Sequence, residues 1–240
     1  MELINLLVVI VDLFERYLEV VSLVGENTWF RKSGFVACRN EVDTGGILVT
    51  GLNPFVPVNG LYVPTRSYPN PFSGETNSYF TKIKSILPEE YIDRTAYLDL
   101  FPFYEHSQES LLWQVKQNPN FAAKILAVTK DEIERLCPRL IIIASKASYP
   151  FWGVYDDSTW MGYKFEEHEI QGVNNDVRRI SGFKERKERK DIVGISKNSK
   201  LVGSIVVLYN HPRALKKEEI LSPEQVKSLY ESAIKHNILY

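Results

Sequence analysis

The sequence is poor in cysteine, with Cys38 and Cys137 as the only two among 240 residues. Two thiols cannot complete a four-thiolate zinc or iron–sulfur site, and they provide no disulfide framework. We therefore expect a protein of a reducing compartment that uses neither a thiolate-bound metal nor a cofactor.

Long apolar runs are also lacking. The run Leu6–Val11 has six residues, and Asp12, Glu15 and Arg16 follow it closely. A run of this length is too short to span a bilayer, and no basic segment precedes it as in a signal peptide. The polar residues among the leucines and valines predict a mostly buried helix instead. We expect a cytoplasmic monomer that does not insert into a membrane.

The chain has no overall excess of positive charge, since its formal net charge is −1. Taken alone, this argues against binding to nucleic acid. However, residues 178–190 contain seven basic side chains and two acidic ones, a local charge of +5, so the remainder sums to −6. Such a run is typical of a solvated face, and it is also a candidate arm for contacting a nucleic-acid backbone.

Short apolar runs predict the strands. Runs without alternation fit strands that are buried on both faces, and four such runs stand out: Gly46–Thr50, Thr95–Asp99, Arg139–Ala144 and Ser204–Tyr209. Segments with helical spacing separate the first three, at about 76–87 and 107–136. The sequence therefore predicts an α/β protein, a three-layer α/β/α sandwich with a mainly parallel four-stranded central sheet.

Three local signals refine this prediction. Asn118-Pro119 should divide the segment 107–136 into two helices, and Ser222-Pro223-Glu-Gln225 has the pattern of a capping box that opens a final helix to about His236. No linker divides the chain, so we expect a single domain over residues 1–240. Residues 155–200 lack a long apolar run and are interpreted as an insertion, a hairpin or a long ordered loop.

Polar residues follow the predicted strands where a parallel sheet places its ligand crevice. The first strand leads into Gly51-Leu-Asn53-Pro54, the second ends at Asp99, and the last leads into Asn210-His211-Pro212. Because the carboxyl ends of parallel strands share one edge of the sheet, we expect Asn53, Asp99 and His211 to converge.

These motifs resemble those of the uracil-DNA glycosylase superfamily, most closely its mismatch-specific and single-strand-selective branches. The resemblance extends from Gly51 to Leu215, and the residues that carry it are Gly51-Leu-Asn-Pro54, Pro71-Phe72, Asn77, Tyr79-Phe80, Ile83, Asp99 with Pro102, and His211-Pro-Arg-Ala-Leu215. It implies a monofunctional DNA glycosylase, a hydrolase of base excision repair that removes a damaged or mismatched base from DNA.

The resemblance also implies roles for individual residues. Asn53 would orient the attacking water, and His211 would donate a hydrogen bond to the departing base. Base-binding residues would be Gly51, Phe72 as a stacking platform, Asp99 and Asn77, which is also the expected N-cap of its helix. DNA contacts would come from four residues near the last motif: Arg213, Leu215 as the wedge, Lys216 and Lys217.

Three positions depart from the family pattern: Phe55 replaces a glycine, Arg213 replaces a small hydroxyl residue, and Asp99 stands where uracil-specific members have asparagine. An ionised carboxylate offers only acceptors, so Asp99 favours a base with an exocyclic amine unless a raised pKa keeps it protonated. Two alternatives stay open: a catalytically silent binder of nucleic acid with the same fold, and a hydrolase of free nucleosides or nucleotides.

Overall fold

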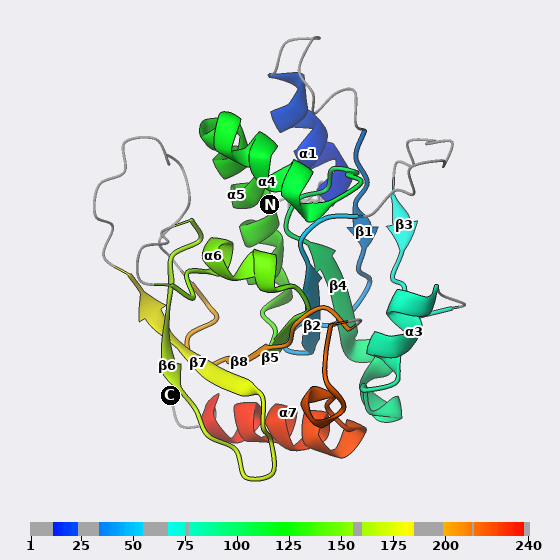
Figure 1. The fold of residues 1–240 in the computed structure, drawn as a ribbon, viewed down its shortest axis with the longest axis vertical. Helices are drawn as coiled ribbons and strands as arrows, with labels where there is room; N and C mark the ends of the chain where they lie inside the picture. Colours follow the sequence, from blue (N-terminus) through cyan, green and yellow to red (C-terminus); the bar gives the residue numbers. More distant parts are fainter. Residues whose placement is uncertain are drawn as a thin grey trace, which may run out of the picture.

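The computed structural model describes residues 12–23, 34–54, 67–74, 77–155, 160–184, 199–212 and 214–237. Residues 236 and 237 are described by their backbone alone. The fold is α/β, with a mostly parallel central sheet and helices (Figure 1). Its sheet contains six strands in the order β4-β2-β5-β8-β7-β6. Their bounds are β2 Ile47–Gly51, β4 Thr95–Asp99, β5 Leu140–Ile143, β6 Tyr163–Glu167, β7 Asp176–Phe183 and β8 Ile205–Leu208.

The four predicted strands, β2, β4, β5 and β8, pair in parallel, and almost every residue in them is buried. Consecutive side chains on a strand point to opposite faces, and Leu48 and Val49 accordingly belong to two different hydrophobic clusters. The sheet therefore has apolar packing on both of its faces.

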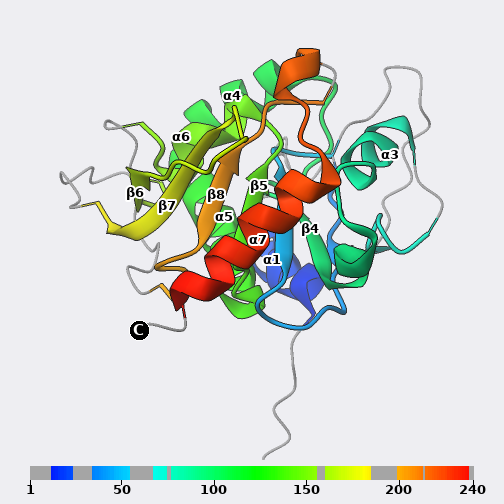
Figure 2. The same ribbon diagram turned by 90° about the horizontal axis from the view of Figure 1, so that it is seen from below.

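Helices cover both of these faces. The Leu48 side packs against α1 (Leu13–Ser22), α4 (Gln108–Gln117), α5 (Pro119–Leu136) and α6 (Tyr149–Trp152). The Val49 side packs against α3 (Ser78–Lys84) and α7 (Pro223–Asn237). Figure 2 shows α7 crossing the near face of the sheet with α5 and α6 behind it. The remaining elements are short: β1 (Cys38–Arg39) pairs with β3 (Tyr68–Pro69), and the 3-10 turns are η1 (Glu89–Arg94), η2 (Lys146–Ser148) and η3 (Lys217–Glu219).

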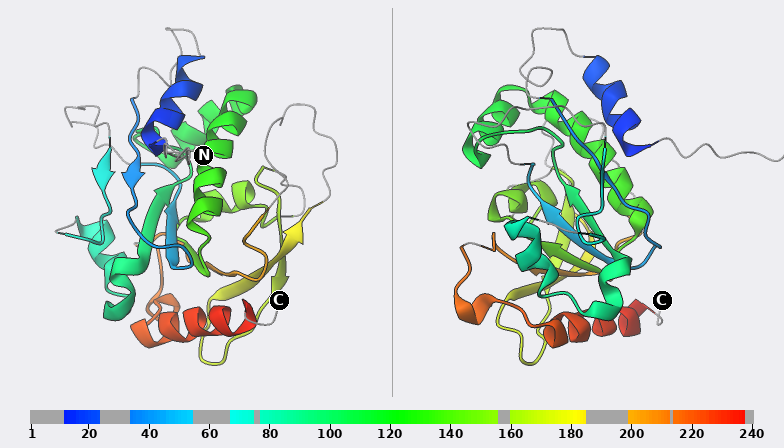
Figure 3. Two further views of the ribbon diagram at one scale, coloured as in Figure 1. Left: turned by 180° about the vertical axis from the view of Figure 1, so that it is seen from behind. Right: turned by 90° about the vertical axis from the view of Figure 1, so that its right-hand side faces the viewer.

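The prediction of a four-stranded sheet was wrong, because the insertion adds β6 and β7 to the sheet. These strands form an antiparallel hairpin, and β7 also pairs antiparallel with β8. Figures 1 and 3 place the hairpin at the opposite side of the sheet from α3. Antiparallel strands can leave one face to solvent, and most side chains of the hairpin are only partly buried or exposed, so no continuous apolar run marks it. The hairpin was one of the two forms expected for this segment.

A buried polar cluster joins the hairpin to α5. The Tyr163 hydroxyl on β6 donates to Glu134 Oε1 at 2.8 Å, and the ammonium of Lys130 lies 3.3 Å from the same oxygen. The Lys130 side chain is 1% exposed and also lies over the rings of Tyr163 and Phe183. Burial of a lysine is tolerated only where its charge is paired, so this cluster fixes the hairpin against the domain.

The two local signals for helix boundaries are confirmed. Helices α4 and α5 are separated at Asn118, with Pro119 at the start of α5. At the start of α7, the Ser222 hydroxyl accepts from the Gln225 N–H at 3.3 Å, and Gln225 Oε1 accepts from the Ser222 N–H at 2.7 Å. These two reciprocal bonds are the predicted capping box.

Removing this cap has a measurable expected cost. Ser222→Ala should lower the free energy of unfolding by about 1 kcal/mol, because the Gln225 N–H loses its acceptor. Ser85→Ala is the matched control, since this exposed hydroxyl only donates to the Lys82 carbonyl. Urea unfolding of both variants measures the difference. Equal stability of the two would show that the cap contributes nothing.

Candidate active site

The carboxyl ends of the four parallel strands lie at one edge of the sheet. Gly51 at the end of β2 pairs with Asp99 at the end of β4, and Ile143 at the end of β5 pairs with Leu208 on β8. From β2 the chain passes first to β4 on one side and later to β5 on the other. Ligand crevices in open α/β sheets form at such a reversal of strand order, so this edge is the candidate site.

Asn53 is held in place by main-chain carbonyl groups. Its side-chain NH₂ donates to Pro54 O at 2.9 Å and, more weakly, to Phe103 O at 3.5 Å. The loop itself is tied to the segment after β4, because the Phe101 N–H donates to Leu52 O at 2.9 Å. These bonds fix the orientation of the amide and leave Oδ1 as an acceptor on its opposite side. Asn53 therefore has the geometry of a group that orients a hydrogen-bond donor.

Gly51 makes room for the side chain of Asp99. A Cβ atom at position 51 would lie 2.2 Å from Asp99 Oδ1 and 2.5 Å from the Tyr97 hydroxyl oxygen. The Tyr97 hydroxyl donates to the same Asp99 oxygen at 2.8 Å. Only a residue without a side chain fits beside Asp99 and Tyr97, and this steric restriction explains why position 51 of the motif is glycine.

Burial raises the pKa of Asp99 to about 7, although the hydrogen bond from Tyr97 acts in the opposite direction. The groups around the carboxyl are themselves weak acids: Cys38 from β1, Tyr68 from β3 and Tyr79 from α3. Burial raises the pKa of each of these groups, and the negative charge of Asp99 raises it further. Asp99 thus lies in an acidic, desolvated cluster at the end of β4.

Tyr79 joins this cluster to His211. The rings of Tyr79 and His211 have centroids 5.2 Å apart at an angle of 37°. The ring of Phe80 contacts those of Tyr79 and Tyr97, with centroids 5.0 Å and 4.8 Å away. The loop of His211 is ordered by two bonds: its N–H donates to Asn210 Oδ1 at 2.8 Å, and its carbonyl accepts from the Ala214 N–H at 2.8 Å. Side chains from α3, β4 and the loop after β8 thus form one connected set.

Asn77 is the N-cap of α3. Its side-chain oxygen accepts from the N–H groups of Tyr79 at 3.0 Å and Phe80 at 3.2 Å. This confirms the capping role that the sequence also allowed. The cap fixes the first turn of α3 and, with it, the position of Tyr79 beside His211.

Phe72 is a core residue in this structure. It is 1% exposed, and its ring packs edge-on against Phe80, with centroids 6.2 Å apart, and against Tyr97, with centroids 6.3 Å apart. A stacking platform must present an open ring face to a base, and Phe72 presents none here. The aromatic ring that lies beside His211 is that of Tyr79.

The predicted DNA-contacting residues lie in different environments. Leu215 is half-buried and packs against the apolar cluster beneath α7 and α3, whereas Lys216 and Lys217 are exposed. Glu218 and Glu219 follow the two lysines, and the Glu219 carboxylate accepts from the Lys216 N–H at 2.8 Å. Arg213 and Phe55 lie outside the described residues.

The basic run begins on β7 and leads away from the candidate site. Asp176 at the start of β7 pairs with Leu208 at the carboxyl end of β8, and Arg179 pairs with Ile205 at the opposite end. Arg178 forms an ion pair with Asp176, and Arg179 forms one with Glu166. Both arginines are therefore partly neutralised within the hairpin. Residues 185–190 lie outside the described residues.

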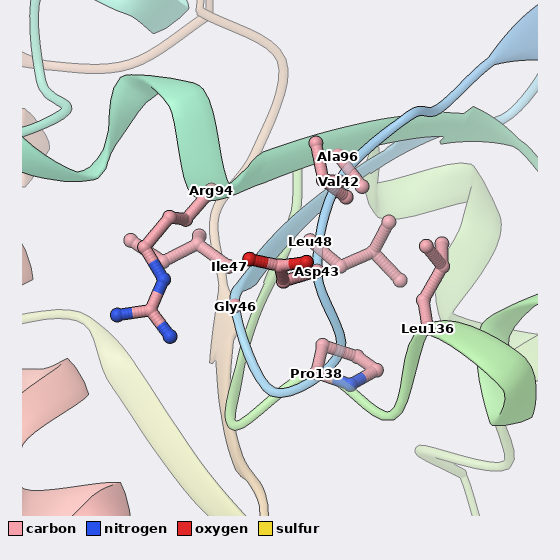
Figure 4. A pocket seen from close by; sticks show the side chains of 9 residues that line it. All are labelled: Val42, Asp43, Gly46, Ile47, Leu48, Arg94, Ala96, Leu136 and Pro138. Carbon is pink, nitrogen blue, oxygen red and sulfur yellow. The ribbon is translucent and has the colours of Figure 1, made fainter.

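A small depression lies at the opposite edge of the sheet. Gly46 and Ile47 at the start of β2, together with Arg94 and Pro138, belong to its lining (Figure 4). It is too tight to hold a water molecule, so it is not a ligand site.

Within the described segments no helix is long and apolar enough to cross a membrane. In the same segments no group of three or more His, Cys, Asp or Glu side chains could hold a metal ion.

Comparison with known proteins does not assign this arrangement to a family. Neither the models of known protein families nor the curated proteins contain a match to the chain. The assignment of function therefore depends on the geometry of the site and on the motifs themselves.

Sequence reasoning missed Tyr97 and the role of Tyr79. A usable signal existed for Tyr97, because residues two apart on a strand share a face, and Tyr97 precedes Asp99 by two. No local signal points to the role of Tyr79, since its contact with His211 joins segments more than a hundred residues apart.

Proposed function

We propose that this chain is a monofunctional DNA glycosylase-like hydrolase with a three-layer α/β/α fold. It would cleave the N-glycosidic bond of a flipped damaged or mismatched base with a positioned water and no cofactor. The observation that carries the proposal is the connection of His211 through the rings of α3 to Tyr97 and Asp99, at the strand edge that also holds Asn53. The resemblance of the motifs adds support from the sequence.

The chemistry of the reaction matches these residue types. The bond between the sugar C1′ and the base nitrogen breaks, the base leaves with the bonding electrons, and the sugar approaches an oxocarbenium ion. His211 would donate a hydrogen bond to a base carbonyl oxygen as negative charge develops on it. Asn53 Oδ1 would accept from the water that attacks C1′, and the proton lost by the water would finally reside on the base or in solvent.

To reach the site, the base would have to leave the base stack of the DNA duplex. Leu215 would fill the gap in the duplex, and Lys216 and Lys217, with Arg213, would contact phosphates. Because Phe72 is buried, Tyr79 is the better candidate for stacking on the flipped base. The proposed partner is therefore DNA, bound mainly through the loop that follows β8.

One observation favours a hydrolase of free nucleosides or nucleotides as the second candidate. The arginines that begin the basic run are ion-paired within the hairpin, and the strand that carries them leads away from the site. A small substrate needs neither a basic arm nor Leu215. The two functions are separated by neutralising four basic residues together: Arg186, Lys187, Arg189 and Lys190. Weaker activity on DNA supports the glycosylase. Activity on free nucleosides or nucleotides that the substitutions leave unchanged supports the nucleoside hydrolase.

The proposal is tested by incubating the protein with oligonucleotides that each carry one deaminated, oxidised or mismatched base, in single-stranded and duplex form. Alkali converts an abasic site into a strand break. The expected result is a break at the modified base only after alkali, because the enzyme lacks a lyase step. Salt-dependent DNA binding without any alkali-labile site in the panel would instead identify the silent binder.

A further inference from the structure

The turn of the insertion hairpin is bonded to the loop that follows β8. Asn175, the last residue before β7, donates from its side-chain NH₂ to Glu219 O on η3 at 2.9 Å. The side-chain NH₂ of Gln225, at the start of α7, donates to Gly172 O in the same turn. Figures 1 and 3 show this turn close to α7. Two amide side chains thus join segments that lie 44 and 53 residues apart in the chain.

Apolar packing supports the same contact. Ile170 and Val173 from the turn and Leu215 from the loop all pack against the apolar cluster beneath α7 and α3. Leu221, which follows η3, is buried in this cluster. The turn between β6 and β7 and the loop after β8 therefore share one apolar base, and the two amide bonds fix their relative position on it.

The four residues from 216 to 219 carry equal numbers of opposite charges. Lys216 and Lys217 are followed by Glu218 and Glu219, so this segment has no net charge that would attract DNA. Its attraction for phosphate depends instead on where each charged group is held. The Glu219 carboxylate accepts from the Lys216 N–H at 2.8 Å, whereas both lysine side chains are exposed. The ordered turn thus holds one carboxylate against the backbone and presents the ammonium groups to solvent.

We propose that the side chains of Asn175 and Gln225 are positioning groups for DNA binding. They hold η3 so that Lys216 and Lys217 meet the phosphates of the DNA backbone. The Asn175 bond ends on the carbonyl of Glu219, the residue whose carboxylate closes the turn. The insertion then contributes to DNA binding through the turn of its hairpin as well as through any contact of its basic run. This inference rests on the proposed function, because it requires DNA as the partner.

Loss of either bond should weaken DNA binding without changing the chemical step. A loop that lacks this support must be ordered when DNA binds, and the ordering lowers the affinity. One hydrogen bond corresponds to about a 2–10-fold change in the dissociation constant. The rate of base release at saturating DNA should remain that of the wild type, because the bonds that order the loop around His211 lie within residues 210–214.

The first test compares Asn175→Ala with Asn174→Ala, which removes an exposed asparagine from the same turn. Fluorescence anisotropy measures binding to a labelled duplex with one tetrahydrofuran residue, a stable analogue of an abasic product. Asn175→Ala should bind about 2–10-fold more weakly than the wild type, and Asn174→Ala should bind equally well. The slope of log K against log salt should also become shallower by about 1–2 in Asn175→Ala. This substitution removes no charge, so a change of slope reports displaced lysines.

A double-mutant cycle shows whether Asn175 acts through the lysines. In a chain that already carries Lys216→Ala and Lys217→Ala, adding Asn175→Ala should cause no further loss of affinity, because no ammonium group is left to position. Urea unfolding establishes that every variant is folded under the binding conditions.

Gln225→Glu tests the second bond independently. Glutamate keeps the acceptor for the Ser222 N–H in the capping box but loses the donor to Gly172 O. Gln171→Glu is its control, since it adds the same charge at an exposed position in the same turn. Gln225→Glu should bind the duplex about 2–10-fold more weakly than this control. Equal affinity of the two variants overturns the role of Gln225.

The outcomes separate this inference from the proposed function. Equal affinity of Asn175→Ala and Asn174→Ala, or a full additional loss in the chain without the two lysines, overturns the positioning role even if bases are released. A loss of affinity that vanishes in that chain supports the positioning role, and it does so even without base release from any substrate, which would overturn the hydrolase. Absence of binding between the wild type and the duplex at low salt overturns both.

Discussion

Replacing Asn53 by alanine is expected to slow base release on the order of a hundredfold or more, the range found for positioned catalytic groups. The amide is fixed by its bonds to Pro54 O and Phe103 O, which leave Oδ1 to orient the attacking water. The truncated variant loses this acceptor without leaving a charge or a large cavity. Single-turnover rates on a substrate identified in the oligonucleotide panel measure the effect.

The control for this substitution is Asn174→Ala, which removes an exposed asparagine from the turn between β6 and β7. Its rate should equal that of the wild type, and both variants should unfold at similar urea concentrations. His211→Ala should slow base release to a similar extent, because the departing base loses its hydrogen-bond donor. Undiminished rates in both the Asn53 and the His211 variant would remove these residues from the mechanism.

Replacing Gly51 by alanine is the second change with a large expected effect. The added methyl group would lie 2.2 Å from Asp99 Oδ1 and 2.5 Å from the Tyr97 hydroxyl, well inside van der Waals contact. Either the carboxyl and phenol move or β2 shifts away from β4. We expect a loss of about 1–3 kcal/mol in the free energy of unfolding, as for other overpacked sites, and loss of base release with it.

Gly74→Ala is the matched control for this prediction. A Cβ atom at position 74 would have no other heavy atom within 4 Å, so the substitution should change stability by no more than about 0.5 kcal/mol. Urea unfolding of the two variants gives the comparison. A Gly51→Ala variant as stable and as active as Gly74→Ala would show that Asp99 and Tyr97 do not need the space beside β2.

The parallel part of the sheet could be predicted because its strands are buried on both faces. The run Thr95–Asp99 coincides with β4, and the other three runs fall within one residue of β2, β5 and β8 at each end. Full burial requires apolar residues at every position, and that leaves a clear signal in the sequence. The capping box at Ser222 was equally clear, because both of its partners lie within one turn of a helix.

The hairpin was harder to predict, because antiparallel strands can leave one face to solvent and then need only one apolar face. β6 has the sequence Tyr-Lys-Phe-Glu-Glu, and β7 carries Arg178 and Arg179 within its pairing region. The sequence of these residues is typical of an exposed loop, and only their ion pairs and strand register show that they form a hairpin. The course of β7 away from the candidate site could not be predicted either, since it depends on β7 pairing antiparallel with β8.

The candidate site was predictable in its location and less so in its chemistry. The motif order places Asn53, Asp99 and His211 at strand ends, and parallel pairing brings strand ends together. Motif register gave Phe72 a role, but it contains no information on burial, and the ring is in the core. The raised pKa of Asp99 comes from its burial in the folded chain, and no local sequence pattern reveals this burial.

The most direct test is base release in water enriched in oxygen-18, with the wild type and the Asn53→Ala, His211→Ala double variant compared by mass spectrometry. A hydrolase with a positioned water should yield the free base and one oxygen-18 atom at C1′ of an otherwise intact strand. The double variant should yield neither above background. Absence of free base from every modified oligonucleotide, or equal release by the double variant, would contradict a glycosylase site at this edge of the sheet.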